Sequence, residues 1–179
     1  MVEAIGGMKM GRLRVLLDTN IYGYVIEFDL DLVQRITSCN RIVVYGNTVI
    51  RKELRDTPKE KKTETMQGYR MLLLNNFDLI AGKHVIPVTK QTEELAKEYF
   101  KEFKGNKGVQ SWQKIKNDFL IVASAALKNL DLVVSEDNKT MLSKKAVDSY
   151  QVVNGKHLIR TPTFFDYKNF KKIVTSCDT

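Results

Sequence analysis

The sequence has few of the features that mark disordered, membrane-spanning or repeat proteins. It contains only three prolines and no low-complexity tract, which argues against extended disordered regions. The longest apolar run, residues 119–127, is far shorter than the ~20 residues of a membrane span and is typical of a buried helix. No internal repeat is visible, and 179 residues suit one domain better than two. We therefore predict a single domain without membrane spans.

Cysteine and histidine are also scarce. Cys39 and Cys177 are far apart and in no metal-ligand spacing, so they are expected to be reduced thiols. His84 and His157 are equally distant, and each stands in an apolar segment that predicts a strand. Such histidines are more often core or edge residues than an acid–base pair. No glycine-rich phosphate loop is present, so the common nucleotide-binding motifs are excluded.

The N-terminal segment has no apolar stretch of the kind that signal peptides contain. Residues 1–11 are therefore expected to be a flexible leader, and residues 12–179 the domain. The expected location is the cytoplasm.

Charge gives a first indication of a partner. The chain has 29 basic and 21 acidic residues, a formal net charge of +8, which favours a polyanion such as nucleic acid. Surface lysines that serve solubility or ion pairing would explain the same excess. Charge alone thus raises the expectation of nucleic-acid binding only modestly.

Strand and helix patterns alternate along the chain, which is typical of an α/β protein. Strands are predicted at 12–17, 41–45, 84–88, 132–135 and 157–160. Helices are predicted at 21–38, 48–54, 92–103, 115–130, 140–150 and from residue 162 onward, and segments 57–67 and 71–74 predict a helical hairpin. The alternation predicts a three-layer α/β/α sandwich with a mostly parallel sheet of about five strands.

Four acidic residues stand where these strands pass into helices or loops. Asp18 ends the first strand and Asp137 follows the fourth, while Glu53 lies on the helix after the second strand. Asp118 is expected to open the most apolar helix. Each acid alone is explained by a helix cap, a turn or a solvated face, but parallel strands would bring all four to one sheet edge. Carboxylates gathered there would need a divalent cation.

The segments around these acids resemble the PIN-domain family, which includes VapC-type ribonucleases. The resemblance rests on segments 16–20, 117–125 and 134–137 together with Glu53, and it covers about residues 13–165. It implies a PIN fold and metal-dependent hydrolysis of RNA, in a toxin–antitoxin pair or in RNA processing. It also implies catalytic and metal-binding roles for Asp18, Glu53, Asp118 and Asp137, with Asn20 and Ser135 supporting them.

Two features depart from the family's pattern, and a third observation excludes another class of enzyme. Glu136 adjoins Asp137, and strand alternation favours Ser135 and Asp137 on one side. The chain is longer than compact toxins around 57–67 and 101–116, which weighs against a toxin more than against a nuclease. Asn20 occupies the position of the second Asp of haloacid-dehalogenase phosphatases, and its presence removes the general acid that those enzymes require.

The carboxylate set indicates a particular metal chemistry. Oxygen-only ligands select hard cations such as Mg²⁺ or Mn²⁺, which activate water and stabilise the attacking and leaving oxygens. The alternative is a catalytically inactive PIN-like scaffold that binds RNA or protein.

Basic and aromatic residues near the acids in sequence predict contacts with RNA. Segment 101–116 is expected to grip phosphates and stack a base, although a solvated loop with Trp112 against the core explains it equally well. The candidate RNA contacts are Arg51, Lys52, Lys104, Lys107, Trp112, Lys114 and Lys116. Other candidate partners are an antitoxin-like protein and a second copy of the chain, joined through 71–74 or 164–165 unless these are buried.

Overall fold

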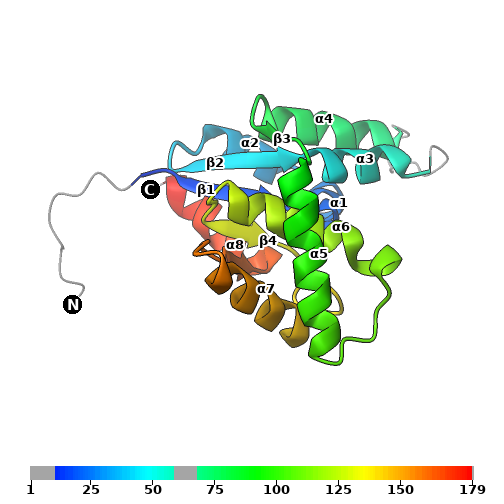
Figure 1. Ribbon diagram of the computed structural model, residues 1–179. Coiled ribbons are helices and arrows are strands. Elements are labelled where there is room, and N and C mark those ends of the chain that lie inside the picture. Colours follow the sequence, from blue (N-terminus) through cyan, green and yellow to red (C-terminus); the bar gives the residue numbers. More distant parts are fainter. Residues whose placement is uncertain (1–10, 59–67, 179) are drawn as a thin grey trace, which may run out of the picture.

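The computed structural model of the chain describes residues 11–58 and 68–178 (Figure 1). The leader expected at 1–11 lies outside the described residues except for Gly11, and so does most of segment 57–67. None of the helices in the described ranges has the length and apolarity that a membrane crossing requires.

A five-stranded sheet forms the centre of the structure. Its strands are β1 (Leu13–Leu17), β2 (Ile42–Asn47), β3 (Val85–Ile86), β4 (Leu132–Val134) and β5 (Thr163–Phe165). All neighbouring pairs are parallel, in the order β3-β2-β1-β4-β5. β4 and the last three residues of β1 are buried runs of Leu and Val, the composition of strands that are covered on both faces. The prediction of a parallel sheet of about five strands is confirmed.

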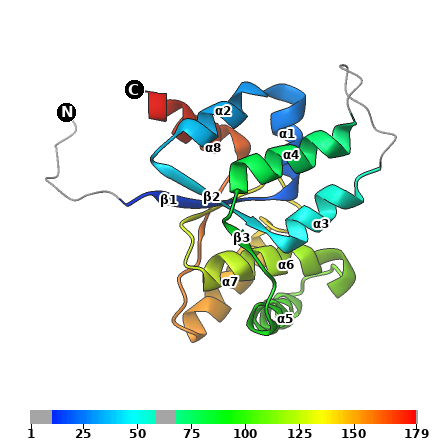
Figure 2. The same cartoon turned by 90° about the horizontal axis from the view of Figure 1, so that it is seen from above.

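Helices cover both faces of this sheet. They are α1 (Thr19–Phe28), α2 (Asp31–Ser38), α3 (Thr48–Asp56), α4 (Tyr69–Ala81), α5 (Lys90–Gly105), α6 (Trp112–Leu127), α7 (Lys144–Lys156) and α8 (Tyr167–Thr175), followed by the short 3-10 helix η1 (Ser176–Asp178). Figure 2 shows α1, α2, α4 and α8 on one face and α5, α6 and α7 on the other. α3 follows β2 and contacts both α4 and α6. The predicted three-layer sandwich is therefore present.

The first helical segment is divided, whereas one helix was predicted over 21–38. α1 ends at Phe28, where Asp29 leaves the helical region with φ −161° and ψ 62°, and α2 begins at Asp31. The break lets α2 turn back along the sheet and contact both α4 and α8. The periodicity continues across the break, which explains why the sequence pattern did not reveal it.

The C-terminal elements differ from the predicted ones. Residues 157–160 form no strand, because His157 caps α7 and Leu158 has a positive φ of 55°. β5 instead uses Thr163–Phe165, a β-branched and aromatic run. The last helix begins at Tyr167 rather than Pro162, because the Asp166 side chain caps it by accepting a hydrogen bond from Asn169 N.

The core lies between β1, β4 and the apolar helix α6, whose residues 119–126 are all buried. On the opposite face, α4 packs closely on β2 at Gly46, where an added Cβ would stand 2.4 Å from Phe77 Cζ. The apolar segments considered for self-association are mixed: Leu73 is buried, Met71 is exposed, and Phe164 and Phe165 are half-buried.

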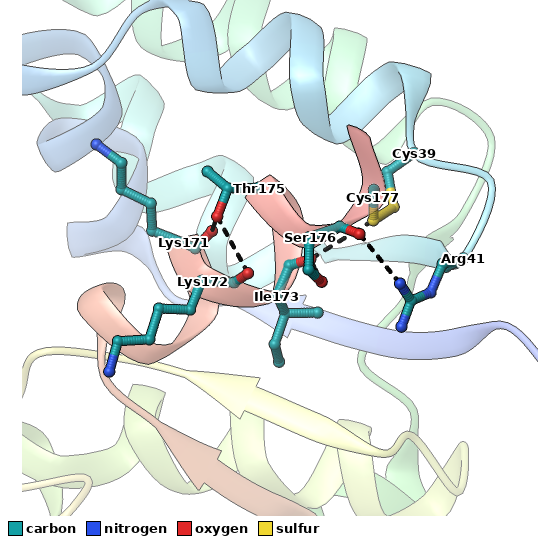
Figure 3. Close-up of a disulfide and its surroundings, with 8 residues drawn as sticks. All are labelled: Cys39, Arg41, Lys171, Lys172, Ile173, Thr175, Ser176 and Cys177. Atoms are coloured by element: carbon teal, nitrogen blue, oxygen red, sulfur yellow. Dashed lines mark hydrogen bonds between the residues drawn. A yellow bond between two sulfur atoms is a disulfide. The ribbon is translucent and has the colours of Figure 1, made fainter. Parts of the chain in front are cut away.

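A disulfide joins Cys39 and Cys177, so the expectation of reduced thiols is wrong (Figure 3). Their Cα atoms are 5.6 Å apart although 138 residues separate them in sequence. α8 packs against α2, and η1 then brings Cys177 beside Cys39. The Arg41 guanidinium donates to the Ser176 carbonyl at 3.2 Å beside this link. Because Cys39 lies just before β2, the disulfide fastens the amino end of the sheet.

An ionic cluster lies at the same end. Asp131, just before β4, accepts hydrogen bonds from Arg14 N at 2.7 Å and from Arg160 Nη2 at 2.6 Å. Its carboxylate also forms an ion pair with Arg14 Nε at 3.5 Å. Partial burial alone would raise the pKa of Asp131, but the two arginines outweigh it and lower that pKa.

Candidate acidic site at the carboxyl edge of the sheet

Asp18 leaves the central strand β1 and is 5% exposed. Its carboxylate accepts hydrogen bonds from Thr19 N at 2.7 Å, Ser135 Oγ at 2.6 Å and Asn20 Nδ2 at 2.8 Å. Burial raises the pKa of Asp18 to about 6 against these hydrogen bonds, and the charges of Glu53 and Asp137 add to the rise. The side chain therefore does more than cap α1. It is a buried acid that nearby negative charges destabilise.

Asp118 lies in the second turn of α6, because this helix begins at Trp112. The expectation that Asp118 opens the helix is thus wrong, although its side chain still reaches the carboxyl edge. Burial raises the pKa of Asp118 to about 7, Thr140 opposes this through a hydrogen bond, and the charges of the other three acids reinforce it. Asp18 and Asp118 therefore both favour the protonated state more than ordinary aspartates.

Thr140 connects Asp118 with Asp137 and was not among the predicted site residues. Its Oγ1 lies 2.5 Å from Asp118 Oδ2 and also contacts Asp137 Oδ2. A hydroxyl carries one proton, so it donates to one carboxylate at a time, and a proton on Asp118 would satisfy both contacts. Asp137 Oδ1 accepts from the backbone N of Lys139 and Thr140, both at 2.9 Å. Asp137 thus closes an Asx turn over Lys139 and Thr140, whereas the contact of Thr140 with Asp118 is made between distant segments.

Glu53 approaches the other acids from α3. Its carboxylate accepts from Asn117 Nδ2 at 2.5 Å and from Thr19 Oγ1, neighbours in sequence of Asp118 and Asp18. The buried Asn47 caps α3 by accepting from Val49 N, and its Nδ2 donates to Ser124 Oγ of α6 at 2.7 Å. This bond fixes α3 against α6 and thereby positions Glu53.

Glu136 and Asp137 point in different directions. Glu136 Oε1 accepts from Tyr167 N at 2.7 Å, at the start of α8. Asp137 N is instead bonded to Ser135 Oγ at 3.0 Å, and the same hydroxyl donates to Asp18. The structure therefore places Asp137, and not Glu136, with the other acids.

The acids are held by neutral donors. Among the residues that the structure describes, no three or more acidic, histidine or cysteine side chains are arranged to hold a metal ion as they stand. Hydroxyl and amide groups contact the carboxylates instead; they belong to Thr19, Asn20, Asn117, Ser135 and Thr140. The donor chemistry fits a hard cation, because all four acids offer oxygen and two have raised pKa values that a bound cation would lower.

Three of the candidate RNA contacts are engaged within the protein. Arg51 pairs with Asp78 on α4, with Nη2 and Oδ2 3.0 Å apart. Lys104 Nζ donates to the Gly108 carbonyl at 2.8 Å. Trp112 is half-buried, with its ring centroid 5.3 Å from that of Phe100, so it packs on the core as the alternative explanation predicted.

The other four candidates, Lys52, Lys107, Lys114 and Lys116, are exposed. Lys52 adjoins Glu53 on α3, and Lys114 and Lys116 lie on the first turns of α6 before Asp118. Lys107 belongs to the α5–α6 connection, where its carbonyl accepts from Lys145 Nζ at 2.8 Å. Exposed lysines therefore lie on α3 and α6, two of the elements that carry the acids.

Comparisons with known proteins support the fold. No family model and no curated protein matches the chain. Among solved structures, it is similar to VapBC2 from Rickettsia felis bound to a promoter DNA fragment, with a TM-score of 0.56, 15% identity, and coverage of 87% of this chain and 99% of that one. It is also similar to VapBC-1 from nontypeable Haemophilus influenzae, with a TM-score of 0.55, 14% identity, and coverage of 87% of this chain and 99% of that one. For FitAcB from Neisseria gonorrhoeae the TM-score is 0.52, the identity is 17%, and the coverage is 84% of this chain and 96% of that one.

These neighbours are toxin–antitoxin complexes whose toxin is a PIN domain. The PIN resemblance noted from the sequence is therefore confirmed at the level of the fold. At identities of 13–17% the likeness extends to the fold and no further.

Proposed function

We propose that this protein is a metal-dependent ribonuclease that hydrolyses RNA phosphodiester bonds at the acidic site. The observation that carries the proposal is the gathering of Asp18, Glu53, Asp118 and Asp137 at the carboxyl edge of the sheet, with two pKa values raised to about 6 and about 7. Acids held in so unfavourable a setting are typical of functional sites. The PIN fold of the similar toxins supports the same conclusion.

The four acids would hold Mg²⁺ or Mn²⁺. The cation, when bound, lowers the pKa of a water molecule and stabilises negative charge on the phosphoryl oxygens. Ser135 and Asn20 orient the Asp18 carboxylate, and Thr140 sets Asp118 against Asp137. We assign the role of general base to no single residue.

The proposed substrate is RNA because a net charge of +8 and exposed lysines beside the acids favour a polyanion. The choice of RNA among polyanions rests on the PIN resemblance. The proposed location is the cytoplasm, where such a substrate is present. Disulfides are unusual there, so thiol labelling of protein from its native cells tests the location: labelled Cys39 and Cys177 would support it. An antitoxin-like protein is the proposed partner, since the similar structures are complexes of this kind.

The test is cleavage of single-stranded RNA with Mn²⁺ by the purified protein and its Asp18→Asn and Asp118→Asn variants. Both variants should lose at least about 100-fold in rate, since even outer partners of metal ligands contribute 10- to 100-fold. Glu94→Gln is the matched control, an exposed acid on α5 that pairs with Lys90. Wild-type cleavage in both site variants would refute the assignment.

The competing function is a catalytically inactive PIN-like scaffold. It is favoured by one observation, that neutral donors already contact the four carboxylates. Thermal unfolding with and without Mn²⁺ separates the two. A bound ion at 100 times its Kd stabilises the native state by about 2.7 kcal/mol, whereas a scaffold without a metal site would show no shift at millimolar Mn²⁺.

A further inference from the structure

Three aromatic rings, two exposed and one half-buried, form a surface on α1 and the start of α8. Tyr24 and Phe28, one turn apart on α1, are 38% and 71% exposed. The Tyr24 ring centroid lies 5.6 Å from those of both Phe28 and Tyr167, the first residue of α8. Tyr24 is thus the centre of a continuous aromatic surface, which we call the stacking surface.

The stacking surface is bonded to the acidic site through a short chain of groups. Tyr167 N donates to Glu136 Oε1 at 2.7 Å, and Glu136 N donates to Asn20 Oδ1 at 3.3 Å. Asn20 in turn donates to Asp18. Tyr24 follows Asn20 by four residues on α1, so both lie on one face of the helix, and both line a cavity of about 320 Å³. Tyr24 and the start of α8 are therefore both connected to Asn20, which contacts Asp18.

Acids and cations both lie near the stacking surface, and the acids are engaged within the protein. Glu27, which lines the same cavity as Tyr24, accepts from the Tyr69 hydroxyl at 2.9 Å. Asp29 is neutralised by an ion pair with Lys171 and accepts from the Tyr167 hydroxyl at 3.3 Å. Glu136 is held by the backbone N–H at the start of α8. Lys168 and Lys172 are exposed on the same helix. Exposed rings interleaved with lysines are the combination that proteins use to bind single-stranded nucleic acid.

We propose that Tyr24, with Phe28 and Tyr167, stacks bases of single-stranded RNA that lie next to the phosphate at the acidic site. The inference rests on the proposed function, because it assigns these bases to the same substrate. The lysines and the continuity with the acids favour RNA over an apolar protein partner. Stacking accepts any base, so the surface fixes the position of the strand and does not read its sequence.

The experiment measures binding of a fluorescent eight-nucleotide oligoadenylate in EDTA, where metal-dependent cleavage is suppressed. Tyr24→Ala should weaken binding about tenfold, which corresponds to ~1.4 kcal/mol and lies within the range of base–aromatic stacking. Tyr24→Trp should retain binding, because it keeps a ring. Leu79→Ala, an exposed apolar residue on α4, is the matched control and should bind like the wild type.

An abasic octamer with the same phosphates separates stacking from charge. Tyr24→Ala should bind it like the wild type. Equal binding of oligoadenylate by Tyr24→Ala and wild type would overturn the proposal, as would an equal loss on both oligomers. Sedimentation gives a third contrary outcome: a wild-type dimer that Phe28→Ala makes monomeric would show an interface between copies.

The same measurements distinguish this inference from the proposed function. Stacking-dependent binding without Mn²⁺-dependent cleavage would refute the nuclease and leave the stacking surface in place. Cleavage by the wild type with unaltered binding by Tyr24→Ala would refute the stacking surface alone.

Discussion

The two ends of the sheet are built on opposite principles. At the amino end, a disulfide and the Asp131 cluster tie distant segments together with opposite charges and a covalent bond. At the carboxyl end, four acids of like charge approach one another, and within residues 11–58 and 68–178 the groups that contact their carboxylates are neutral donors. Links between distant segments are therefore concentrated at the amino end, and repulsion between like charges is concentrated at the carboxyl end.

The two ends also respond to pH with opposite signs. The pKa of Asp131 is lowered in the folded state, so its contribution to stability is present above the ordinary aspartate pKa and is lost as pH falls. The pKa values of Asp18 and Asp118 are raised to about 6 and about 7, so the folded state holds extra protons and loses stability as pH rises toward 7.

Removing the disulfide should have the largest effect on stability. Cys177→Ser is expected to lower the free energy of unfolding by about 4 kcal/mol, because the link closes a loop of 138 residues. Differential scanning calorimetry should show a fall of about 10 °C in Tm. Cleavage below the new Tm should stay at the wild-type rate, and a rate loss there would mean that the two ends are coupled.

Neutralising Asp118 should stabilise the protein while it removes activity. At pH 8, Asp118→Asn is expected to raise the free energy of unfolding by about 2 kcal/mol. The wild-type carboxyl is ionised at this pH, and its raised pKa means that the folded state disfavours the ionised form. The gain should disappear by about pH 4, where both folded and unfolded wild type approach the protonated state. Urea unfolding at the two pH values measures the difference, and a gain that does not depend on pH would contradict this account.

Neutralising Asp131 should do the reverse. Asp131→Asn is expected to lower the free energy of unfolding by about 1 kcal/mol at pH 7, a modest value because the ion pairs are partly exposed. The loss should fade below about pH 3. The same urea series provides the measurement, and a loss that persists at pH 2 would indicate that packing rather than charge is responsible.

Glu136→Gln should have the smallest effect. Glu136 contacts the start of α8 and not the other acids, so its charge contributes only a helix-dipole interaction of about 0.5 kcal/mol. Mn²⁺-dependent cleavage should stay within about threefold of the wild type, since glutamine can still accept from Tyr167 N. A loss as large as that of Asp137→Asn, measured in parallel, would show that Glu136 belongs to the site.

The sequence predicted four of the five strands, and Asp18 and Asp137 after two of them, because these depend on local patterns. Apolar runs indicated β1, β2 and β4, and Asp18 and Asp137 follow directly from them. The fifth strand was misplaced because residues 157–160 contain the apolar pair of an edge strand, whereas His157 caps α7 and Leu158 has a positive φ. Local pattern cannot show such a bend.

What the sequence did not predict depends on contacts between distant segments. Thr140 matters because α6 brings Asp118 beside it, and the Cys39–Cys177 pair exists because α8 packs on α2. The sequence favoured an RNA contact and a core position of Trp112 equally. Its contact with Phe100 on α5 is a tertiary contact that no local pattern contains.

The pairing of β1 with β4 has a consequence for the order in which the protein is made. Asp18 and Ser135 are bonded across 117 positions, and Asp118 meets Thr140 only after β4 has been added beside β1. Asp18 and Glu53 are therefore synthesised long before the residues that complete their surroundings. The growing chain carries these acids without an assembled site, so any nuclease activity is withheld until β4 and the turn after it have been synthesised.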